Sequence, residues 1–244
     1  MTDRPEDMGD FYSQLAQYYD DIYTELDYEG AAHKIHALVQ KYKTTQGNNL
    51  LDVACGTGAH ILYLKDRYNP VGLDLSEEML EVARKKCPDV EFVQGNMTSF
   101  DLGQKFDVIT CLFGSIGYLT TQNELADAIS TFSRHMFSGG VLIIEPIFTR
   151  ETVRAGFMGI SCLDLPDIKI ARVNVSRIEG DLAYLDFNFL IATKERGVEH
   201  FIDPSPMGIF PRDTYISLME KNGFNTDFVE PGLMKEGLFV GVKT

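Results

Sequence analysis

Short apolar runs alternate with amphipathic, helix-spaced patterns over the first 145 residues of the chain. The first apolar run, residues 50–53, lies between Asn48-Asn49 and a glycine-rich turn, as is typical of a short buried strand. We expect strands over residues 50–53, 71–75, 90–94, 107–113 and 141–145, the last opened by Gly139-Gly140, and helices over residues 11–42, 59–68, 76–87 and 122–137. Strands that alternate with helices predict a parallel sheet covered on both faces.

The pattern changes after Pro146. Residues 168–178 and 182–194 form two extended runs joined by Glu179-Gly180-Asp181, which is typical of a hairpin turn. We therefore expect residues 147–208 to be an inserted antiparallel β subdomain, a candidate lid or dimer surface.

The C-terminal residues return to the first pattern. A helix is expected over residues 212–222, with Gly223 as its C-terminal cap. Two further strands are expected near residues 225–230 and 238–242. Residues 1–146 and 209–244 would then make one α/β domain around the insert.

A glycine-rich turn, Cys55-Gly56-Thr57-Gly58, follows the first expected strand. Glycine has no side chain to keep a ligand away from the backbone, and the helix that follows offers free N–H groups at its N-terminus. A nicotinamide-binding turn would usually have a third glycine where this chain has Ile61. The turn therefore favours a nucleotide-like ligand and argues against a nicotinamide one.

Polar side chains mark the ends of three successive expected strands: Asp52, Asp74 and Asn96. Ligands of open α/β sheets bind at the carboxyl ends of the strands, so these three side chains are expected to converge on one crevice. A carboxylate at Asp74 can accept hydrogen bonds from both hydroxyls of a ribose. The amide of Asn96 can bond the edge of an adenine, and Met97 can pack on its ring. The combination predicts an adenosine-containing ligand.

Charge and composition narrow the function classes. The formal net charge is -14, with no cluster of Lys and Arg, which argues against a nucleic-acid partner and is compatible with a cationic or zwitterionic substrate. No apolar run approaches the roughly 20 residues of a membrane helix, and the polar start does not resemble a signal peptide. We therefore expect a cytoplasmic enzyme. The four cysteines lack metal-ligand spacing, so neither a metal site nor a disulfide is expected.

Three motifs resemble those of class I S-adenosylmethionine (SAM)-dependent methyltransferases. They are Leu51-Asp52-Val53-Ala54-Cys55-Gly56-Thr57-Gly58, Gly72-Leu73-Asp74-Leu75-Ser76-Glu77-Glu78-Met79-Leu80, and Gln94-Gly95-Asn96-Met97. The resemblance implies a Rossmann-like, seven-stranded methyltransferase sheet with SAM as cofactor. In that family the glycine loop faces the methionine part of SAM, the acidic residue holds the ribose, and the third motif meets adenine. The cofactor-binding residues expected on this basis are Tyr19, Tyr23, Asp52, Ala54, Gly56, Gly58, Asp74, Leu75, Met79, Asn96, Met97 and Leu112.

The chain also resembles, over nearly its whole length, the nucleotide-linked aminosugar N,N-dimethyltransferases of the desosamine and mycaminose type. The stretches that carry this resemblance are Leu15-Ala16-Gln17-Tyr18-Tyr19-Asp20, Cys111-Leu112-Phe113-Gly114-Ser115-Ile116-Gly117-Tyr118, Val141-Leu142-Ile143-Ile144-Glu145-Pro146 and Gly237-Leu238-Phe239-Val240-Gly241-Val242. Those relatives are dimers with an antiparallel insert, so a homodimer is expected. The chain departs from their pattern on the acceptor side: Tyr118 stands where they usually have His, Glu236 where they tend to have Arg, and Ile147-Phe148 where they have paired Trp.

Methyl transfer from a sulfonium is an in-line displacement, in which correct positioning can contribute roughly 7–11 kcal/mol. An amine acceptor needs only a weak base or water, and no metal. Tyr118 is a candidate for orienting the nucleophile or for accepting a proton through water, and Ser115 for a hydrogen bond to the acceptor. Glu145 is a candidate for binding a cationic amine. Arg172 and Arg177 in the insert are candidates for contacting an anionic part of the substrate.

Three functions stay open on the sequence alone. The first is a small-molecule N-methyltransferase, with an amino sugar as a candidate acceptor. The second is a methyltransferase with an oxygen or carboxylate acceptor. The third is a binding module for SAM or a nucleotide without catalysis, or a nicotinamide enzyme.

Overall fold

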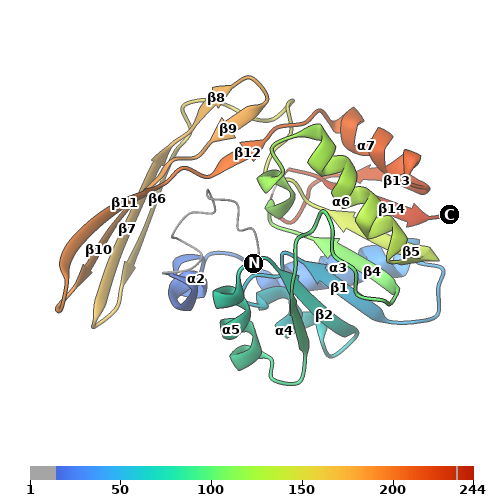
Figure 1. The fold of residues 1–244 in the computed structure, drawn as a ribbon, viewed down its shortest axis with the longest axis horizontal. Coiled ribbons are helices and arrows are strands. Elements are labelled where there is room, and N and C mark those ends of the chain that lie inside the picture. Colours follow the sequence, from blue (N-terminus) through green and yellow to red (C-terminus); the bar gives the residue numbers. More distant parts are fainter. Residues whose placement is uncertain (1–14, 235) are drawn as a thin grey trace.

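A central sheet of seven strands organises the computed structural model, which describes residues 15–234 and 236–244 (Figure 1). The strands are β1 (Asn49–Val53), β2 (Asn69–Asp74), β3 (Glu91–Gln94), β4 (Phe106–Cys111), β5 (Met136–Ile144), β13 (Phe224–Val229) and β14 (Leu238–Lys243). Their order is β13-β14-β5-β4-β1-β2-β3. Strands β1 to β5 are parallel, and β14 runs antiparallel between β5 and β13.

Helices cover both faces of this sheet. They are α3 (Tyr28–Tyr42), α4 (Ala59–Leu64), α5 (Glu77–Lys86), α6 (Gln122–Arg134) and α7 (Arg212–Lys221). Side chains alternate between the faces of a strand, so Leu50 packs with α3 and α4 while Leu51 packs with α6 and α7. The Rossmann-like fold predicted from the sequence is confirmed.

The expected single helix over residues 11–42 is wrong. Its described part is a 3₁₀ turn, η1 (Ala16–Tyr18), a short helix α2 (Tyr19–Ile22) and the separate helix α3; residues 11–14 lie outside the described residues. The break occurs because Asp27 caps α3: its Oδ1 accepts a hydrogen bond from the backbone N–H of Gly30 at 2.8 Å.

The fifth strand also begins earlier than expected, at Met136 and not after Gly139-Gly140. The pairing of β4 with β5 is irregular between Phe106 and Val108, and Gly139 has a φ of 82°. A bulge that glycine tolerates lets the strand continue through both glycines.

Two antiparallel sheets lie between β5 and α7. Their strands are β6 (Met158–Asp164), β7 (Ile168–Val175), β8 (Arg177–Glu179), β9 (Leu182–Tyr184), β10 (Phe187–Thr193), β11 (Gly197–Asp203) and β12 (Pro206–Gly208). The orders are β11-β10-β7-β6 and β12-β9-β8. The expected hairpin is confirmed as β8–β9. The two expected extended runs, residues 168–178 and 182–194, each divide into two strands that belong to different sheets. Strands β6 and β11 were not expected. The division into a domain of residues 1–146 and 209–244 and a subdomain of residues 147–208 stays a prediction.

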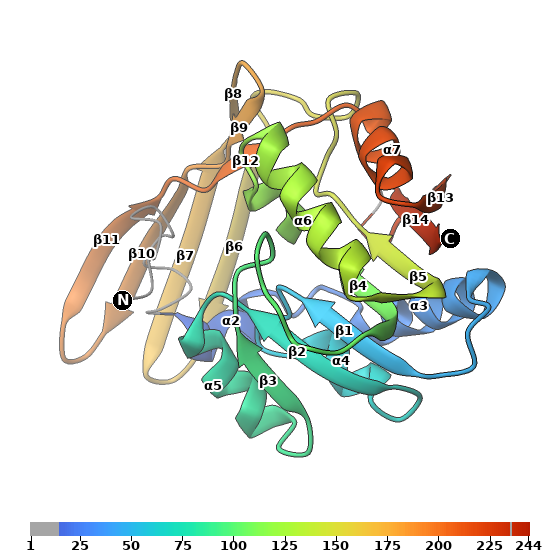
Figure 2. The ribbon, with the colours of Figure 1, turned by 45° about the vertical axis from the view of Figure 1, so that its right-hand side comes forward.

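The N-terminal segment lies between the four-stranded sheet and the main sheet (Figures 1 and 2). Apolar side chains from Leu15 to Tyr23 pack against Ile170 and Phe189 on the inner face of the four-stranded sheet. On its other side, Asp20 forms an ion pair with Lys86 of α5 and accepts a hydrogen bond from Thr57 at 2.6 Å. The segment thereby ties the insert to the glycine-rich turn.

Two kinds of structure are absent from residues 15–234 and 236–244, a membrane-spanning helix and a metal-binding cluster. No helix there is long and apolar enough to cross a bilayer. Nor does that part of the chain gather three or more His, Cys, Asp or Glu side chains in a metal-binding arrangement.

Candidate active site

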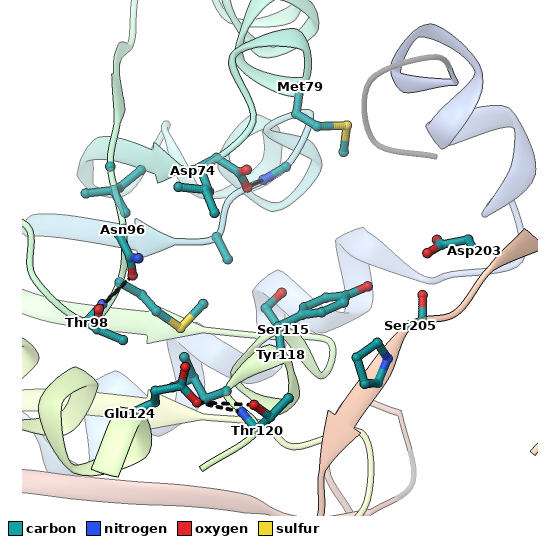
Figure 3. A pocket seen from close by; sticks show the side chains of 18 of the residues that line it. Asp74, Met79, Asn96, Thr98, Ser115, Tyr118, Thr120, Glu124, Asp203 and Ser205 are labelled. Atoms are coloured by element: carbon teal, nitrogen blue, oxygen red, sulfur yellow. Dashed lines mark hydrogen bonds between the residues drawn. The ribbon is translucent and has the colours of Figure 1, made fainter. Parts of the chain in front are cut away.

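A cavity of about 360 Å³ opens at the carboxyl ends of β1, β2 and β3 (Figure 3). Ligand pockets generally span roughly 300–1,000 Å³, so a small molecule fits this one. The cavity is lined by the strand ends, the α2 segment, the loop around η2 (Ser115–Tyr118) and the link from β11 to β12. Met79 of α5 and Glu124 of α6 complete the lining. The lining residues are Tyr19, Ala54, Gly56, Leu73, Asp74, Leu75, Met79, Gly95, Asn96, Met97, Thr98, Ser115, Tyr118, Leu119, Thr120, Glu124, Asp203, Ser205 and Pro206.

Asp74 is fixed by the two backbone segments beside it. Its Oδ2 accepts a hydrogen bond from the N–H of Gly56 at 2.8 Å, and its Oδ1 accepts one from the N–H of Ser76 at 2.9 Å. Burial raises the pKa of Asp74, and these N–H bonds act in the opposite direction. A carboxylate has about four lone-pair sites, so acceptor capacity remains for a ligand diol in the cavity.

The glycine-rich turn presents backbone to the cavity. Gly56 has a φ of 55°, and an added Cβ there would approach Met79 Cε at 3.3 Å. Ala54, Phe113 and Ser205 also have positive φ, at 56°, 49° and 33°, although they carry side chains. Such conformations cost about 1–3 kcal/mol each and gather at functional sites. Ala54 and Ser205 both line the cavity.

Asn96 has a defined orientation. Its Oδ1 accepts hydrogen bonds from the N–H and the hydroxyl of Thr98, both at 2.9 Å. The oxygen is thus occupied by the protein, and the amide nitrogen is the group left to donate to a ligand. A donor at this place suits the ring nitrogens of an adenine.

Asp52 lies behind the cavity wall and not in it. Its Oδ1 accepts a hydrogen bond from the hydroxyl of Thr110 at 2.7 Å, whereas Oδ2 is buried with no hydrogen-bond partner among the described residues. Burial raises the pKa of Asp52 to about 7, against the lowering effect of the Thr110 bond. An unpaired buried oxygen is costly, so this atom needs a partner that a ligand or water brings.

The cavity brings together most of the expected cofactor residues. Those that line it are Tyr19, Ala54, Gly56, Asp74, Leu75, Met79, Asn96 and Met97. Four expected residues lie outside its wall: Tyr23, Asp52, Gly58 and Leu112. Gly58 lets α4 approach α5, because an added Cβ would meet Ala83 and Phe92 at 3.3 Å. Leu112 packs in the core with α3.

The expected acceptor-side residues also fall into two groups, those that line the cavity and those that lie outside its wall. Ser115 and Tyr118 line the cavity, whereas Glu145 does not. The carboxylate of Glu145 is fully buried and accepts backbone N–H bonds from Phe113 at 3.2 Å, Leu233 at 2.6 Å and Met234 at 2.9 Å. In this structure Glu145 joins the loop at Phe113 to the loop at Leu233 and Met234, and its expected role toward the acceptor stays a prediction. Burial raises its pKa, and the three N–H bonds oppose that shift.

The two arginines proposed for an anionic substrate group have partners within the chain. Arg172 donates to the hydroxyl of Tyr23 at 2.5 Å and lies over the rings of Tyr23 and Phe187. Arg177 forms ion pairs with Glu179 and Asp186. Their role toward a substrate stays a prediction.

Sequence reasoning missed the wall that the insert contributes. Asp203 ends β11, Ser205 and Pro206 come soon after it, and all three line the cavity. The polar, proline-containing sequence Asp203-Pro204-Ser205-Pro206 marks a turn, but nothing in it indicates that the turn returns to the site. Glu124 was also missed, although Thr121 and Glu124 have capping-box spacing and form that box at the start of α6.

Comparison with known proteins identifies the family. A sequence profile described as a methyltransferase domain matches residues 50–140. The dTDP-3-amino-3,4,6-trideoxy-alpha-D-glucopyranose N,N-dimethyltransferase of Streptomyces venezuelae is 37% identical and aligns over 88% of this chain and 91% of its own length. The dTDP-3-amino-3,6-dideoxy-alpha-D-glucopyranose N,N-dimethyltransferase of Streptomyces fradiae is 33% identical, over 96% and 92%. The chain belongs to the SAM-dependent methyltransferases.

The fold of this methyltransferase agrees with that assignment. A solved structure of a SAM-bound amino pentose methyltransferase from Micromonospora echinaspora superposes with a TM-score of 0.83 at 31% identity, covering 93% of this chain and 97% of that one. SAM is the cofactor, as predicted. The site fits it: Asp74 offers acceptors for the ribose, Asn96 a donor for the adenine, and the exposed turn at Gly56 leaves room for the methionine part.

We expect Asp74→Ala to weaken SAM binding about 30-fold or more, because the ribose loses its acceptor and the N–H of Gly56 loses its partner. Isothermal titration calorimetry measures the change. Asp167→Ala is the matched control, since that carboxylate is exposed in the insert and should leave SAM affinity as in the wild type. Unchanged affinity in Asp74→Ala would remove Asp74 from the site.

Proposed function

We propose that this enzyme transfers methyl groups from SAM to the amine nitrogen of a nucleotide-linked amino sugar. The observation that supports this most is that the similarity to the two aminosugar N,N-dimethyltransferases runs through the insert as well as the SAM-binding half. The insert contributes Asp203 and Ser205 to the cavity, so the shared length includes the acceptor side.

The residues of the site act mainly by position. SAM supplies an electrophilic methyl group: as the acceptor's electron pair bonds to that carbon, the carbon–sulfur bond breaks and its electron pair stays on sulfur. Asp74 and Asn96 hold the adenosine part. Ser115 and Tyr118, both on the η2 loop, orient the acceptor nitrogen. Residues 15–23 pack on the insert, and both contribute side chains to the cavity wall.

Product analysis tests the proposed acceptor. The enzyme is incubated with SAM and dTDP-3-amino-3,6-dideoxy-α-D-glucopyranose, and separately with the dTDP-sugar that has a hydroxyl in place of the amine. Mass spectrometry should find two methyl groups on the nitrogen of the first and none on the second. Methylation of the hydroxyl sugar, with the amino sugar untouched, would contradict the proposal and favour an O-methyltransferase.

We expect Tyr118→Phe to lower turnover by less than about 100-fold and to leave SAM affinity unchanged, because the ring stays in place and positioning dominates the catalysis. Steady-state kinetics with the amino sugar and calorimetry with SAM measure the two quantities. Tyr63→Phe, at a half-exposed site on α4, is the control. Complete loss of activity with intact SAM binding would mean instead that Tyr118 does essential proton chemistry.

We also propose that the enzyme is a cytoplasmic homodimer. The donor and the acceptor are charged metabolites that do not cross a membrane unaided, which supports the location. The outer face of the four-stranded sheet supports the dimer. Ile160, Val173, Asn188 and Ile202 form one cross-strand row on this face, and the side chains two residues along each strand, such as Leu190, share it.

This outer face is unusually apolar for a surface. Its exposed apolar side chains are Met158, Ile160, Val173, Val175, Leu190, Val198 and Ile202, with Ile160 74% and Val198 72% exposed. Monomeric proteins rarely expose apolar patches this continuous. A second copy of the same sheet, packed face to face, would bury them and satisfy the two-fold symmetry that most homodimers have.

The double substitution Ile160→Glu with Leu190→Glu should convert a dimer into a monomer, because four like charges would meet at the interface. Sedimentation equilibrium measures the mass. Phe137→Glu places a charge on a half-exposed apolar residue outside this sheet and should leave the dimer intact. A wild-type protein that sediments as a monomer would refute the dimer.

A further inference from the structure

The cavity is lined by carboxylates without a compensating cation. Among the described lining residues none is Lys, Arg or His, whereas Asp74, Glu124 and Asp203 are acidic. A low-dielectric site with this balance favours a ligand group that carries positive charge. The three carboxylates differ in where they lie along the cavity.

Two of the three are engaged elsewhere. Asp74 holds the turns at Gly56 and Ser76, at the adenosine end. Glu124 completes the capping box of α6: its Oε2 accepts the backbone N–H bonds of Thr120 at 3.0 Å and Thr121 at 2.9 Å. Neither carboxylate is placed to receive a charge at the acceptor end.

Asp203 is the carboxylate at that end. It closes β11, where it pairs with Phe187 of β10, and it is only 3% exposed. Figure 3 shows its side chain directed into the cavity beside Ser205, on the side toward which the Tyr118 hydroxyl points, and away from Asn96. The strained φ of Ser205, 33°, keeps the chain turned toward the cavity at this point.

On the basis of the proposed function, we infer that Asp203 binds the protonated amino group of the acceptor and takes its proton. One N–H bond of the ammonium breaks, its electron pair stays on nitrogen, and an O–H bond forms on Asp203, so that a positive and a negative charge become two neutral groups. Neutralisation is favourable in a buried site, where separate charges are poorly solvated. The nitrogen then has the electron pair that methyl transfer requires.

The same step serves both rounds of a dimethylation. The monomethylated nitrogen is again a cation after the first transfer and must again lose a proton. Asp203 takes that proton after passing the first to water. A hydroxyl acceptor carries no charge and gains nothing from the carboxylate, so Asp203 selects nitrogen over oxygen.

The charged and titratable groups around Asp203 come from three elements. Tyr19 and Tyr23 belong to the α2 segment, Arg172 to β7 and Tyr118 to η2. Burial raises the pKa of Tyr23, Arg172 lowers it, and the charge of Asp203 raises it again, with a net increase; burial also raises the pKa of Tyr19. The two phenols therefore stay uncharged between about pH 6 and 9.

The test compares wild type, Asp203→Asn and Glu199→Gln, the last being the same charge change at an exposed site on the same strand. Binding of the amino sugar and of its hydroxyl counterpart is measured by calorimetry with S-adenosylhomocysteine present. We expect the wild type at pH 7 to prefer the amino sugar at least 10-fold, Glu199→Gln to match it, and Asp203→Asn to lose the preference. Turnover of Asp203→Asn should fall about 100-fold or more at pH 7, as for loss of a general base.

The pH profile separates a proton acceptor from a structural residue. The deficit of Asp203→Asn should shrink toward pH 9, because an amine already unprotonated in solution needs no base. Asp203→Glu, which keeps the charge, should restore the amine preference. If Asp203→Asn does not fold, wild-type binding across the same pH range decides, since its amine preference must decline as the free amine loses its proton.

The outcomes distinguish the inference from the proposed function. A wild type that dimethylates the amino sugar, with an Asp203→Asn variant equal to it at every pH, overturns the role of Asp203 alone. A wild-type amine preference that does not change with pH does the same. A wild type that methylates the hydroxyl sugar and not the amine overturns both.

Discussion

The site depends on one carboxylate that binds two backbone N–H groups. Asp74 ends β2 and reaches the turn after β1 through Gly56 and the start of α5 through Ser76. It therefore links the ends of β1 and β2 to the start of α5, and it keeps lone pairs for a ligand in the cavity. Gly72, two residues earlier on β2, makes room for the Phe92 ring, because an added Cβ would lie 2.5 Å from it.

The enclosure of the cavity depends on a second set of contacts. Asp20 bonds Lys86 and Thr57, so the N-terminal segment is attached to the same turn and the same helix that Asp74 joins. The opposite side of that segment packs on Phe189 and its neighbours in the insert. Movement of the segment would thus disturb the glycine-rich turn and the insert together, which couples closure over the acceptor to the shape of the cofactor site.

The sequence predicted the parts of the fold that rest on local rules. The apolar run at 50–53, the glycine-rich turn and the helix expected from residue 76 each express a constraint within a few residues, and each is confirmed. The interruption between α2 and α3 was missed because apolar spacing continues through it and only the Asp27 cap marks the break. In the insert, the chain passes from one sheet to the other at Ser176 and again at Asp186. Asp186 has a φ of 41°, and nothing in the sequence indicates this because residues other than glycine rarely adopt a positive φ.

The same distinction explains why the cofactor half of the site was foreseeable and the acceptor half was not. The cofactor half consists largely of backbone and of side chains at successive strand ends, whose convergence follows from sheet topology. The acceptor half brings η2 together with β11, about 85 residues further along, through tertiary pairing alone. A phenol such as that of Tyr118 is a poor proton acceptor near neutral pH, so under the proposed function the proton of an amine must pass to another group. The carboxylate that the insert carries into the cavity lies on the side toward which this phenol points.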